Sequence, residues 1–454
     1  MVSDSLTRNT LLLTGASLLM SGIGMGYHAW LARSLGAAGL GLCQLTLSVS
    51  SLCATLAVSG IRFASTRLVA EELGGGHGGG RSAMGRCLAY AAFCGFCALM
   101  LLRLLAEPLG FLWIGDARTV LSLRIAALSM PCVSLCAALS GYFTACGVVW
   151  KPALAHLVEQ LAGFGLSAVL LARGDPGDLE RRCAAVMLSR AAADLLAVLL
   201  LAVFFLGDRQ RPPAQNTSGR YGARLLRLAL PLAVSAYTRS ALTTLRQLLI
   251  PRGLRASGLS AERALADYGV IQGMVMPLLF FPACLLSSAA ELIVPVLTAA
   301  QVQNDAPRIK NTAGKLLRLS LRYSLAVSGI LFLCADLLSG LLFRSREAAR
   351  YLRQLAPLVP VMYLDIAADG CLKGLGKQLW SMGVNVLEAS LGLLLLLLLL
   401  PRWGIHAYVA VLYFCEMLNL ALSLFRLLPC LRASADGARP PCAGSAKCAY
   451  TAGR

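Results

Sequence analysis

The chain has 454 residues, of which 57% are hydrophobic and only 14% are charged, and its mean hydropathy is +0.71. Soluble domains carry about a quarter charged residues, so these values exclude an ordinary soluble globular protein and indicate a chain surrounded mostly by lipid. The formal net charge of +19 is spread between apolar segments, which favours anionic lipid headgroups and control of topology over a nucleic-acid surface.

Apolar segments long enough to span a bilayer, about 20 residues each, recur along the whole chain. The first follows Arg8 and has no signal-peptide cleavage pattern, so we interpret it as a first span that is retained. Segment 269–297 contains three prolines, which predicts a bent or broken helix there. The twelve predicted spans are 10–32, 40–61, 84–106, 120–143, 151–172, 183–206, 225–249, 269–297, 315–338, 352–375, 379–400 and 404–428.

A polar stretch divides these spans into six and six, so we predict an all-α, polytopic membrane protein with two six-helix bundles. An even number of spans in each half gives both halves the same orientation, as in a parallel repeat. Lys and Arg are moderately enriched in the segments that lie inside when both termini are cytoplasmic, which predicts that orientation. The predicted domains are an N-terminal bundle (1–206), a cytoplasmic linker (207–223), a C-terminal bundle (224–428) and a disordered cytoplasmic tail (429–454).

The second half of the chain repeats the first at an offset of 229 residues. Nine of the 37 positions from 123 to 159 are identical in the two halves, where composition alone gives roughly one in twelve. A half-length repeat in an apolar chain is typical of transporters built from two homologous bundles, with the site between them. The identical pairs are Leu123/Leu352, Arg124/Arg353, Ala127/Ala356, Pro131/Pro360, Leu135/Leu364, Ala138/Ala367, Gly141/Gly370, Gly147/Gly376 and Glu159/Glu388.

Cysteine and glycine patterns give little support for metal, redox or nucleotide chemistry. Cys94 and Cys97 form a CxxC inside an apolar segment without a second ligand pair, and most of the 16 cysteines read as small hydrophobic residues. The glycine-rich loop 75–82 lacks the preceding strand that a P-loop requires. The four histidines are scattered, so we predict no catalytic residue, no metal site and no enzymatic function.

Two long blocks of sequence resemble a known family. They are RSLGAAGLGLCQLTLSVSSLCATLAVSGIRFASTRLVAEELG (33–74) and LIPRGLRASGLSAERALADYGVIQGMVMPLLFFPACLLSSAAELIVPVL (249–297). They are similar to the stage V sporulation protein B family of the multidrug/oligosaccharidyl-lipid/polysaccharide exporter superfamily. Larger members of that superfamily can have fourteen spans, whereas twelve are predicted here, so we expect this chain to lack the two additional C-terminal helices and any lipid-tail groove that they form.

The resemblance implies a bacterial plasma-membrane protein that flips a lipid-linked oligosaccharide or peptidoglycan precursor by alternating access, in spore envelope or polysaccharide biosynthesis. We expect a monomer with that saccharide and membrane lipids as its partners, without nucleic acid or a cofactor. The alternative within the same superfamily is a cation-coupled multidrug exporter, for which an acidic or aromatic cavity with few arginines is expected. A scaffold without transport activity would have little use for charges inside its spans.

Arginines inside the predicted spans are the first candidates for substrate binding, because ionisable groups are costly at membrane depth. Arg239 lies about 18 Å beyond Arg227 along its helix, and Arg239, Thr243 and Arg246 share one helix face. An aligned pair of guanidinium groups suits a diphosphate. An intramembrane salt bridge, or snorkelling of Arg246 to the surface, is the alternative. Arg62 ends the second span, where it would attract an anionic headgroup or snorkel.

Four carboxyl groups at membrane depth are candidates either for lining the cavity or for coupling transport to a proton or sodium gradient. Asp365 would alternatively neutralise Arg239 when no substrate is bound. Asp369 would alternatively pair with Lys373 on the same helix. The four candidates are Asp365, Asp369, Glu159 and Glu388.

Two further pairs of polar residues lie inside predicted spans. Arg190 and Asp194 are four residues apart on one helix face, and we interpret them as a local ion pair with a structural role. Glu416 and Asn419 in the last span are weaker candidates for a site.

Overall fold

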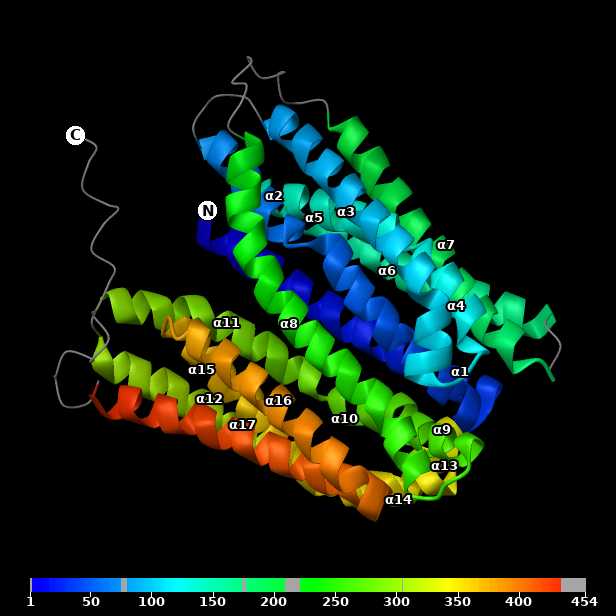
Figure 1. Ribbon diagram of the computed structural model, residues 1–454. Coiled ribbons are helices and arrows are strands. Elements are labelled where there is room, and N and C mark those ends of the chain that lie inside the picture. The colour runs from blue at the N-terminus through cyan, green and yellow to red at the C-terminus, as the bar shows by residue number, and fades with distance from the viewer. Residues whose placement is uncertain (1, 75–79, 174–176, 209–220, 304, 434–454) are drawn as a thin grey trace, which may run out of the picture. The chain divides into compact units, whose positions relative to one another are not determined.

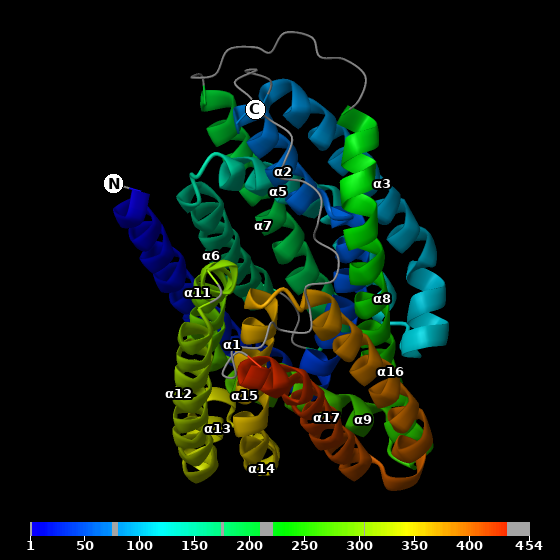
Figure 2. The same cartoon turned by 90° about the vertical axis from the view of Figure 1, so that its left-hand side faces the viewer.

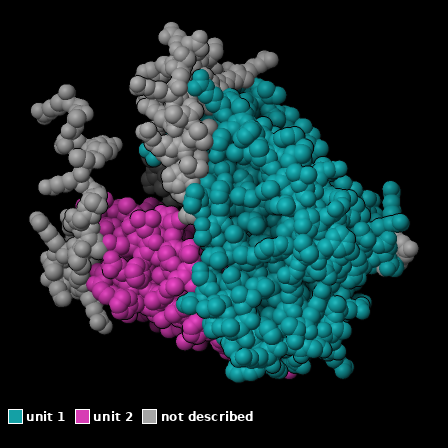
Figure 3. Space-filling model, in the orientation of Figure 1, with its two compact units in different colours: residues 1–281, 336–351, 389–411 teal, residues 282–335, 352–388, 412–454 magenta. Residues whose placement is uncertain are grey.

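The computed structural model (Figure 1; Figure 2) describes residues 2–74, 80–173, 177–208, 221–303 and 305–433. This part of the chain is almost entirely helical and contains no strand. Most of the predicted linker and residues 434–454 of the predicted tail lie outside it, and the predicted domain boundaries stay a prediction. The chain forms two compact units, coloured separately in Figure 3. Unit 1 comprises residues 1–281, 336–351 and 389–411, and unit 2 comprises residues 282–335, 352–388 and 412–454.

Unit 1 contains the helices of the first half of the chain and the first helices of the second half. In Figure 1, α6 and α7 lie side by side, as do α3 and α5. Its helices are α1 (Val2–Val58), α2 (Ile61–Gly74), α3 (Gly80–Pro108), η1 (Leu109–Ile114), α4 (Thr119–Ala127), α5 (Met130–Ala145), α6 (Trp150–Arg173), α7 (Leu179–Gly207), α8 (Tyr221–Ala256), α9 (Ala261–Gly269), η2 (Val270–Val275), α10 (Met276–Phe280), α13 (Ala335–Phe343) and most of α14 (Arg346–Leu355).

Unit 2 is built from later helices, among which α11, α12 and α15 pack together (Figure 2). The division between the units falls after the first residue of α13 and within α14, α16 and α17, so each of these helices contributes to both. The helices of unit 2 are α11 (Ala283–Val302), α12 (Ala306–Leu333), η3 (Ala356–Leu358), α15 (Val359–Gly374), the first part of α16 (Gln378–Trp403) and most of α17 (Ile405–Ala433).

Several helices begin at residues that satisfy their free backbone N–H groups. The side chains of Asp178, Ser260 and Asp305 accept hydrogen bonds from the backbone three residues on, at the starts of α7, α9 and α12. Such N-caps stabilise a helix by about 1 kcal/mol. Proline stands in the first turn of α5 and of α15, where the missing N–H costs nothing.

The first two predicted spans are continuous helix apart from one residue. Gly36 has φ 71° and ψ 177°, a conformation that other residues rarely adopt, and it kinks α1 between the two spans. Residues 33–39, between the two predicted spans, are therefore helix and not a loop, because a single glycine makes the change of direction. The second span also continues further than predicted, through a break at Ser59 and Gly60 into α2.

The predicted span 269–297 has the wrong limits. Helix begins eight residues earlier, at Ala261, where Ser260 caps it, and it continues through η2 and α10. The expected break occurs at Phe281 and Pro282, after which α11 runs to Val302. The residues of α9 before position 269 form helix but are not continuously apolar, so a search for apolar segments did not include them.

Nine helices in the described part are long and apolar enough to span a membrane, or ten if the bent pair α4 and α5 is one span. One of the nine, Ser17–Ala70, contains two predicted spans that meet at Gly36. The 36-residue α8 covers another predicted span. The helix count is thus consistent with about twelve spans, and the prediction of an all-α, polytopic membrane protein is confirmed.

The 229-residue repeat is visible in the helix boundaries. α5 (Met130–Ala145) and α15 (Val359–Gly374) start and end at repeat-related residues, and α6 and α16 agree within one residue. Gly147 and Gly376, which follow α5 and α15, both have left-handed backbones with φ near 70°. Gly115 and its mate Arg344 also share positive φ. Matching backbone geometry at matched positions indicates two copies of one helical unit.

Glycines bring the backbones of α1 and α9 into direct contact within unit 1. A Cβ atom at Gly269 would lie 2.6 Å from the Gly41 backbone nitrogen and would clash with the Ala37 carbonyl oxygen. A Cβ atom at Gly41 would clash with the carbonyl oxygen of Leu265. Small residues at a helix crossing permit such approach in a membrane, where packing rather than hydrophobic burial holds helices together. We call this contact the glycine crossing.

Substitution of the glycine crossing should destabilise the protein. We expect Gly269→Ala to cost about 1–3 kcal/mol, because the added methyl group forces two backbones apart. The measurement is the apparent Tm of the purified protein in detergent. The matched control is Gly85→Ala, where a Cβ meets open space. A Tm of Gly269→Ala equal to that of the control would contradict the observed contact.

Candidate functional site

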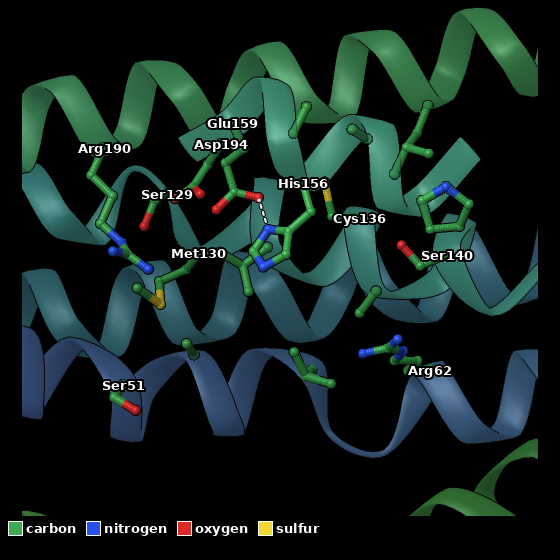
Figure 4. Close-up of a pocket in the computed structure, with 18 of the residues that line it drawn as sticks. Ser51, Arg62, Ser129, Met130, Cys136, Ser140, His156, Glu159, Arg190 and Asp194 are labelled. Carbon is green, nitrogen blue, oxygen red and sulfur yellow. Dashed lines mark hydrogen bonds and ion pairs between the residues drawn. The ribbon is translucent and has the colours of Figure 1, made fainter. Parts of the chain in front are cut away.

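The first site in unit 1 is a cavity of about 650 Å³ enclosed by α1, α2, α4, α5, α6 and α7. We call it the carboxylate cavity, because Glu159 and Asp194 line it together with His156, Arg190 and Arg62. Figure 4 shows these side chains projecting from their helices into the same space. Five ionisable groups within an apolar bundle are costly unless they face a cavity, a partner or a ligand.

The carboxyl groups of the cavity are partnered within it. Nδ1 of His156 lies 3.1 Å from Oε2 of Glu159, one helical turn away on α6 (Figure 4). Asp194, on α7, is only 5% exposed and lies close enough to interact with Glu159 and with the Ser129 hydroxyl. Two neighbouring carboxyl groups and an imidazole form a cluster that can bind or release a proton.

Two guanidinium groups of the carboxylate cavity lie on opposite sides of His156, Arg190 toward one end and Arg62 toward the other (Figure 4). Both side chains are exposed to the cavity. Arg190 is drawn electrostatically to both carboxyl groups. The interpretation of Arg190 and Asp194 as a local structural pair is therefore too narrow, because both residues form the cavity wall.

A second cavity of unit 1, of about 410 Å³, lies between α1 and α8. We call it the hydroxyl groove, because most of its wall is hydroxyl and amide side chains. Arg239 is its one arginine among the described residues, and Thr243 lines it beside Arg239, as the helix-face argument expected. Its polar residues are Gln44, Ser48, Ser51, Thr55, Arg239, Ser240, Thr243, Thr244 and Gln247.

A third cavity of about 710 Å³ lies where α1 breaks into α2, next to α8 and α5. Phe63, Val58 and Ala54 line it, and its Thr66 and Thr144 hydroxyls are bonded to carbonyl oxygens of their own helices. We call it the apolar groove. Arg62 belongs to both this groove and the carboxylate cavity.

The three cavities adjoin one another along α1. Ser51 lines all three, and Thr55 and Ala236 line both grooves. Arg246 lies outside these walls; it is half-buried near Tyr408. The structure thus brings Arg62 and Arg239 to adjoining cavities of one unit and leaves Arg246 apart from them.

Unit 2 contains its own half-buried carboxylate, Asp365. Asp365 on α15 accepts hydrogen bonds from Nδ2 of Asn419 (2.8 Å) and from the Ser423 hydroxyl (2.9 Å), both on α17. Glu388, half-buried on α16, is near enough to act on the Asp365 charge. Because Asp365 and Arg239 belong to different units, their pairing stays a prediction.

Asp369 has partners on two helices of unit 2. Its Oδ2 lies 2.6 Å from Nζ of Lys373 on the same helix, as the alternative interpretation predicted. It also accepts a hydrogen bond from Ser381 at the start of α16. Both contacts stabilise an ionised carboxylate, which favours a structural role for Asp369 over ion coupling.

The polar centres of the two units use corresponding positions of the repeat. Glu159 corresponds to Glu388. The second carboxylate stands on a different helix in each unit. Asp194 on α7 corresponds to Ser423 in the second half. Asp365 on α15 corresponds to Cys136, which lines the carboxylate cavity. In each unit, therefore, a Glu on the middle helix meets an Asp from one of its two neighbours. Sequence comparison alone could not find this equivalence.

The comparisons with known proteins agree with this architecture. A sequence model of the family described as "Polysaccharide biosynthesis protein" matches residues 6–301. The chain belongs to that family. The family described as MatE matches residues 253–398. Stage V sporulation protein B of Bacillus subtilis is 24% identical over 414 residues, which cover 89% of this chain and 80% of the relative. Sporulation protein YkvU of the same organism is 21% identical and covers 54% of this chain and 56% of the relative.

Two solved structures with this fold are described as transporters. An inward-facing multidrug resistance MATE family transporter of the MOP superfamily has a TM-score of 0.72 at 13% identity, over 92% of this chain and 96% of its own. A MOP superfamily transporter from Pyrococcus furiosus, described as having a binding pocket of reverse polarity, has a TM-score of 0.63 at 14% identity, over 94% and 96%. The chain is thus a polytopic membrane protein of the polysaccharide biosynthesis family with the fold of these transporters, and the family resemblance is confirmed.

Water should reach the wall shared by the three cavities. In a cysteine-free background, we expect the Ser51→Cys variant to react with a charged methanethiosulfonate about tenfold faster than the Thr46→Cys variant. The reason is that only a thiolate that water can reach reacts with this reagent. Ser51 is exposed, whereas Thr46, on the same helix, is fully buried. Labelling is read by mass spectrometry. Equal rates at both positions would show that these cavities are not open to water.

Proposed function

We propose that this transporter moves a lipid-linked saccharide, an oligosaccharide or a peptidoglycan precursor, across the bacterial plasma membrane. The observation that carries the proposal is the set of arginines, Arg62, Arg190 and Arg239, that face adjoining cavities inside the apolar bundle of unit 1. Guanidinium groups bind phosphate oxygens through several planar donors, and arginines that face a cavity at membrane depth are suited to such a partner. The family description and the relative named for stage V of sporulation support envelope or polysaccharide biosynthesis as the setting.

The mechanism we infer is alternating access around a fixed binding site. Arginines in the cavities hold the phosphate of the carrier lipid, the saccharide occupies the polar space beside it, and the lipid tail stays in the bilayer. Rocking between inward-open and outward-open states then exposes the headgroup to either side. We further propose a monomer with both termini cytoplasmic, as the distribution of Lys and Arg favours, and membrane lipids as its surroundings.

A coupling ion is the second part of the proposal. The Glu159 and Asp194 pair in unit 1 and Asp365 in unit 2 are the carboxyl groups suited to take up a proton or sodium ion. Asp194 is buried and Glu159 and Asp365 are half-buried, and Glu159 and Asp365 each lie within hydrogen-bond distance of a polar side chain. Binding of an ion to one state and release in the other would tie headgroup movement to an ion gradient.

A cation-coupled multidrug exporter is the second candidate, and the Glu159 and Asp194 pair is the observation that favours it, since organic cations require a carboxylate. Arg62 and Arg190 line the same cavity and repel a cationic drug. Anionic substrates are therefore ranked first. Drug susceptibility of a deletion strain, measured beside its envelope precursors, separates the two functions.

Neutralising the cavity arginines should impair transport. We expect Arg62→Gln and Arg239→Gln each to slow translocation of a fluorescent lipid-linked saccharide in proteoliposomes about tenfold or more, because each loses a charged hydrogen bond. Arg239→Lys should retain part of the activity. The control is Arg252→Gln, an exposed residue of α8 outside the cavities. Wild-type rates in both glutamine variants would reject phosphate binding by these arginines.

Removing the titratable group of a coupling site should uncouple transport. We expect Asp365→Asn or Glu159→Gln to abolish the stimulation of transport by an imposed proton or sodium gradient, while affinity for the lipid-linked substrate changes less than about twofold, because amides retain hydrogen bonds but not charge. Glu291→Gln, on the exposed face of α11, is the control. If both variants respond to the gradients as the wild type does, these carboxylates are not coupling groups.

A further inference from the structure

We propose that the hydroxyl groove between α1 and α8 is a saccharide subsite, which binds the hydroxyl groups of the sugar nearest the phosphate. This inference rests on the proposed function and specifies where the sugar lies. The wall is made of two facing stripes, with Gln44, Ser48 and Thr55 on α1 and Thr243, Thr244 and Gln247 on α8. Among its described lining residues there is no carboxylate and no aromatic ring. Such a surface suits a neutral ligand rich in hydroxyl groups.

Part of this hydroxyl and amide surface is left for a ligand. Thr55 Oγ1 lies 3.2 Å from Ser240 Oγ, and Thr244 Oγ1 donates to the Ser48 carbonyl oxygen at 3.2 Å. These two bonds join α1 to α8. Ser48 as a whole is 7% exposed, and its hydroxyl oxygen is buried at the groove wall without a hydrogen-bond partner in the described structure. A buried hydroxyl without a partner costs free energy, which a ligand hydroxyl would recover.

Three more side chains of the groove keep donors and acceptors available. Gln44, Thr243 and Gln247 line the wall, and no hydrogen bond from their side chains to the described protein is observed. Amide side chains offer two donors and an acceptor in one plane, and the threonine hydroxyl offers both roles. Sugar hydroxyl groups, which donate and accept at neighbouring positions, match this arrangement.

The chemistry changes along α1 in the order that a lipid-linked saccharide requires. The apolar groove lies at the Val58 end, and Arg62 borders it. Arg239 on α8 lies at about the same height along α1 as Thr55, because the residue after Arg239, Ser240, is hydrogen-bonded to Thr55. Beyond this point hydroxyls and amides follow as far as Gln44, about 16 Å further along the helix. Apolar, cationic and hydroxyl surfaces therefore succeed one another, as do the lipid, phosphate and sugar of such a substrate.

A purely structural role for the same polar residues makes a different prediction. Polar side chains between membrane helices commonly bond the helices together. Here Thr55, Ser240 and Thr244 make those bonds, whereas Thr243 and Gln247 do not contribute to them. Variants at Thr243 and Gln247 therefore test the subsite without removing a contact between the helices.

The test measures binding of three lipids to the full chain in nanodiscs: undecaprenyl diphosphate, and the same lipid carrying N-acetylglucosamine or glucose. We expect the wild type to bind a glycosylated lipid more tightly than the bare one. Thr243→Val and Gln247→Leu should each weaken binding of that glycosylated lipid about three- to tenfold, and leave the affinity for undecaprenyl diphosphate unchanged. Thr243→Ser should restore it. The matched control is Thr238→Val, on the same helix, whose hydroxyl bonds the Val234 carbonyl oxygen outside the groove.

The outcomes separate the subsite from the proposed function. Unchanged affinity for undecaprenyl diphosphate also shows that each variant is folded. If all three lipids bind the wild type equally, or if the variants weaken all of them alike, the subsite is wrong and phosphate recognition stands. If no lipid binds the wild type, the proposed function fails together with the subsite.

Discussion

The cost of placing charge inside a hydrocarbon layer governs this molecule. Every ionisable group within a span needs a partner, a polar cavity or a ligand. Asp369 pairs with Lys373, and Asp365 is held by an asparagine and a serine. The arginines of unit 1 face cavities instead. That contrast separates carboxylates with protein partners from arginines whose side chains line a cavity.

The duplicated frame explains where these polar centres lie. In each unit three consecutive spans of the repeat meet, and the middle one contributes a glutamate, Glu159 or Glu388. The partner aspartate comes from a different neighbour in each unit. Arg190 of the first unit corresponds to Asn419, so the first unit contains a cation where the second contains a neutral donor. One scaffold thus supports a cavity with arginines and carboxylates in one unit and a half-buried carboxylate with neutral hydrogen-bond partners in the other.

Much of the fold could be predicted from the sequence, because span length, prolines and the half-length repeat are local or periodic signals. The limits of α9 could not, since Ala261 and its neighbours are not strongly apolar. Contacts between side chains on different helices could not be predicted from the sequence either. Asp194 looked like the local partner of Arg190 at i+4, but helix packing brings it to Glu159 on another helix.

Some candidate substrate-binding residues could be predicted from the sequence, whereas others depend on how the helices pack. Arg62 and Arg239 were found because an arginine inside a span is conspicuous in one sequence. The hydroxyl groove was not, because serine, threonine and glutamine are unremarkable one at a time. Their meaning depends on α1 and α8 lying face to face, and on Ser48 having no partner. His156 likewise gained meaning only when its contact with Glu159 was seen.

If the hydroxyl groove is the saccharide subsite we propose, the glycine crossing also limits the length of saccharide that fits. Gly41 lies three residues beyond Gln44, the last α1 residue on the wall of the hydroxyl groove, and there the α1 backbone meets α9 without an intervening side chain. Side chains can rotate to make room, but two backbones in contact cannot. A headgroup that reaches Gln44 thus meets a fixed stop. The groove would then admit a short saccharide, and any longer chain would have to turn toward the carboxylate cavity.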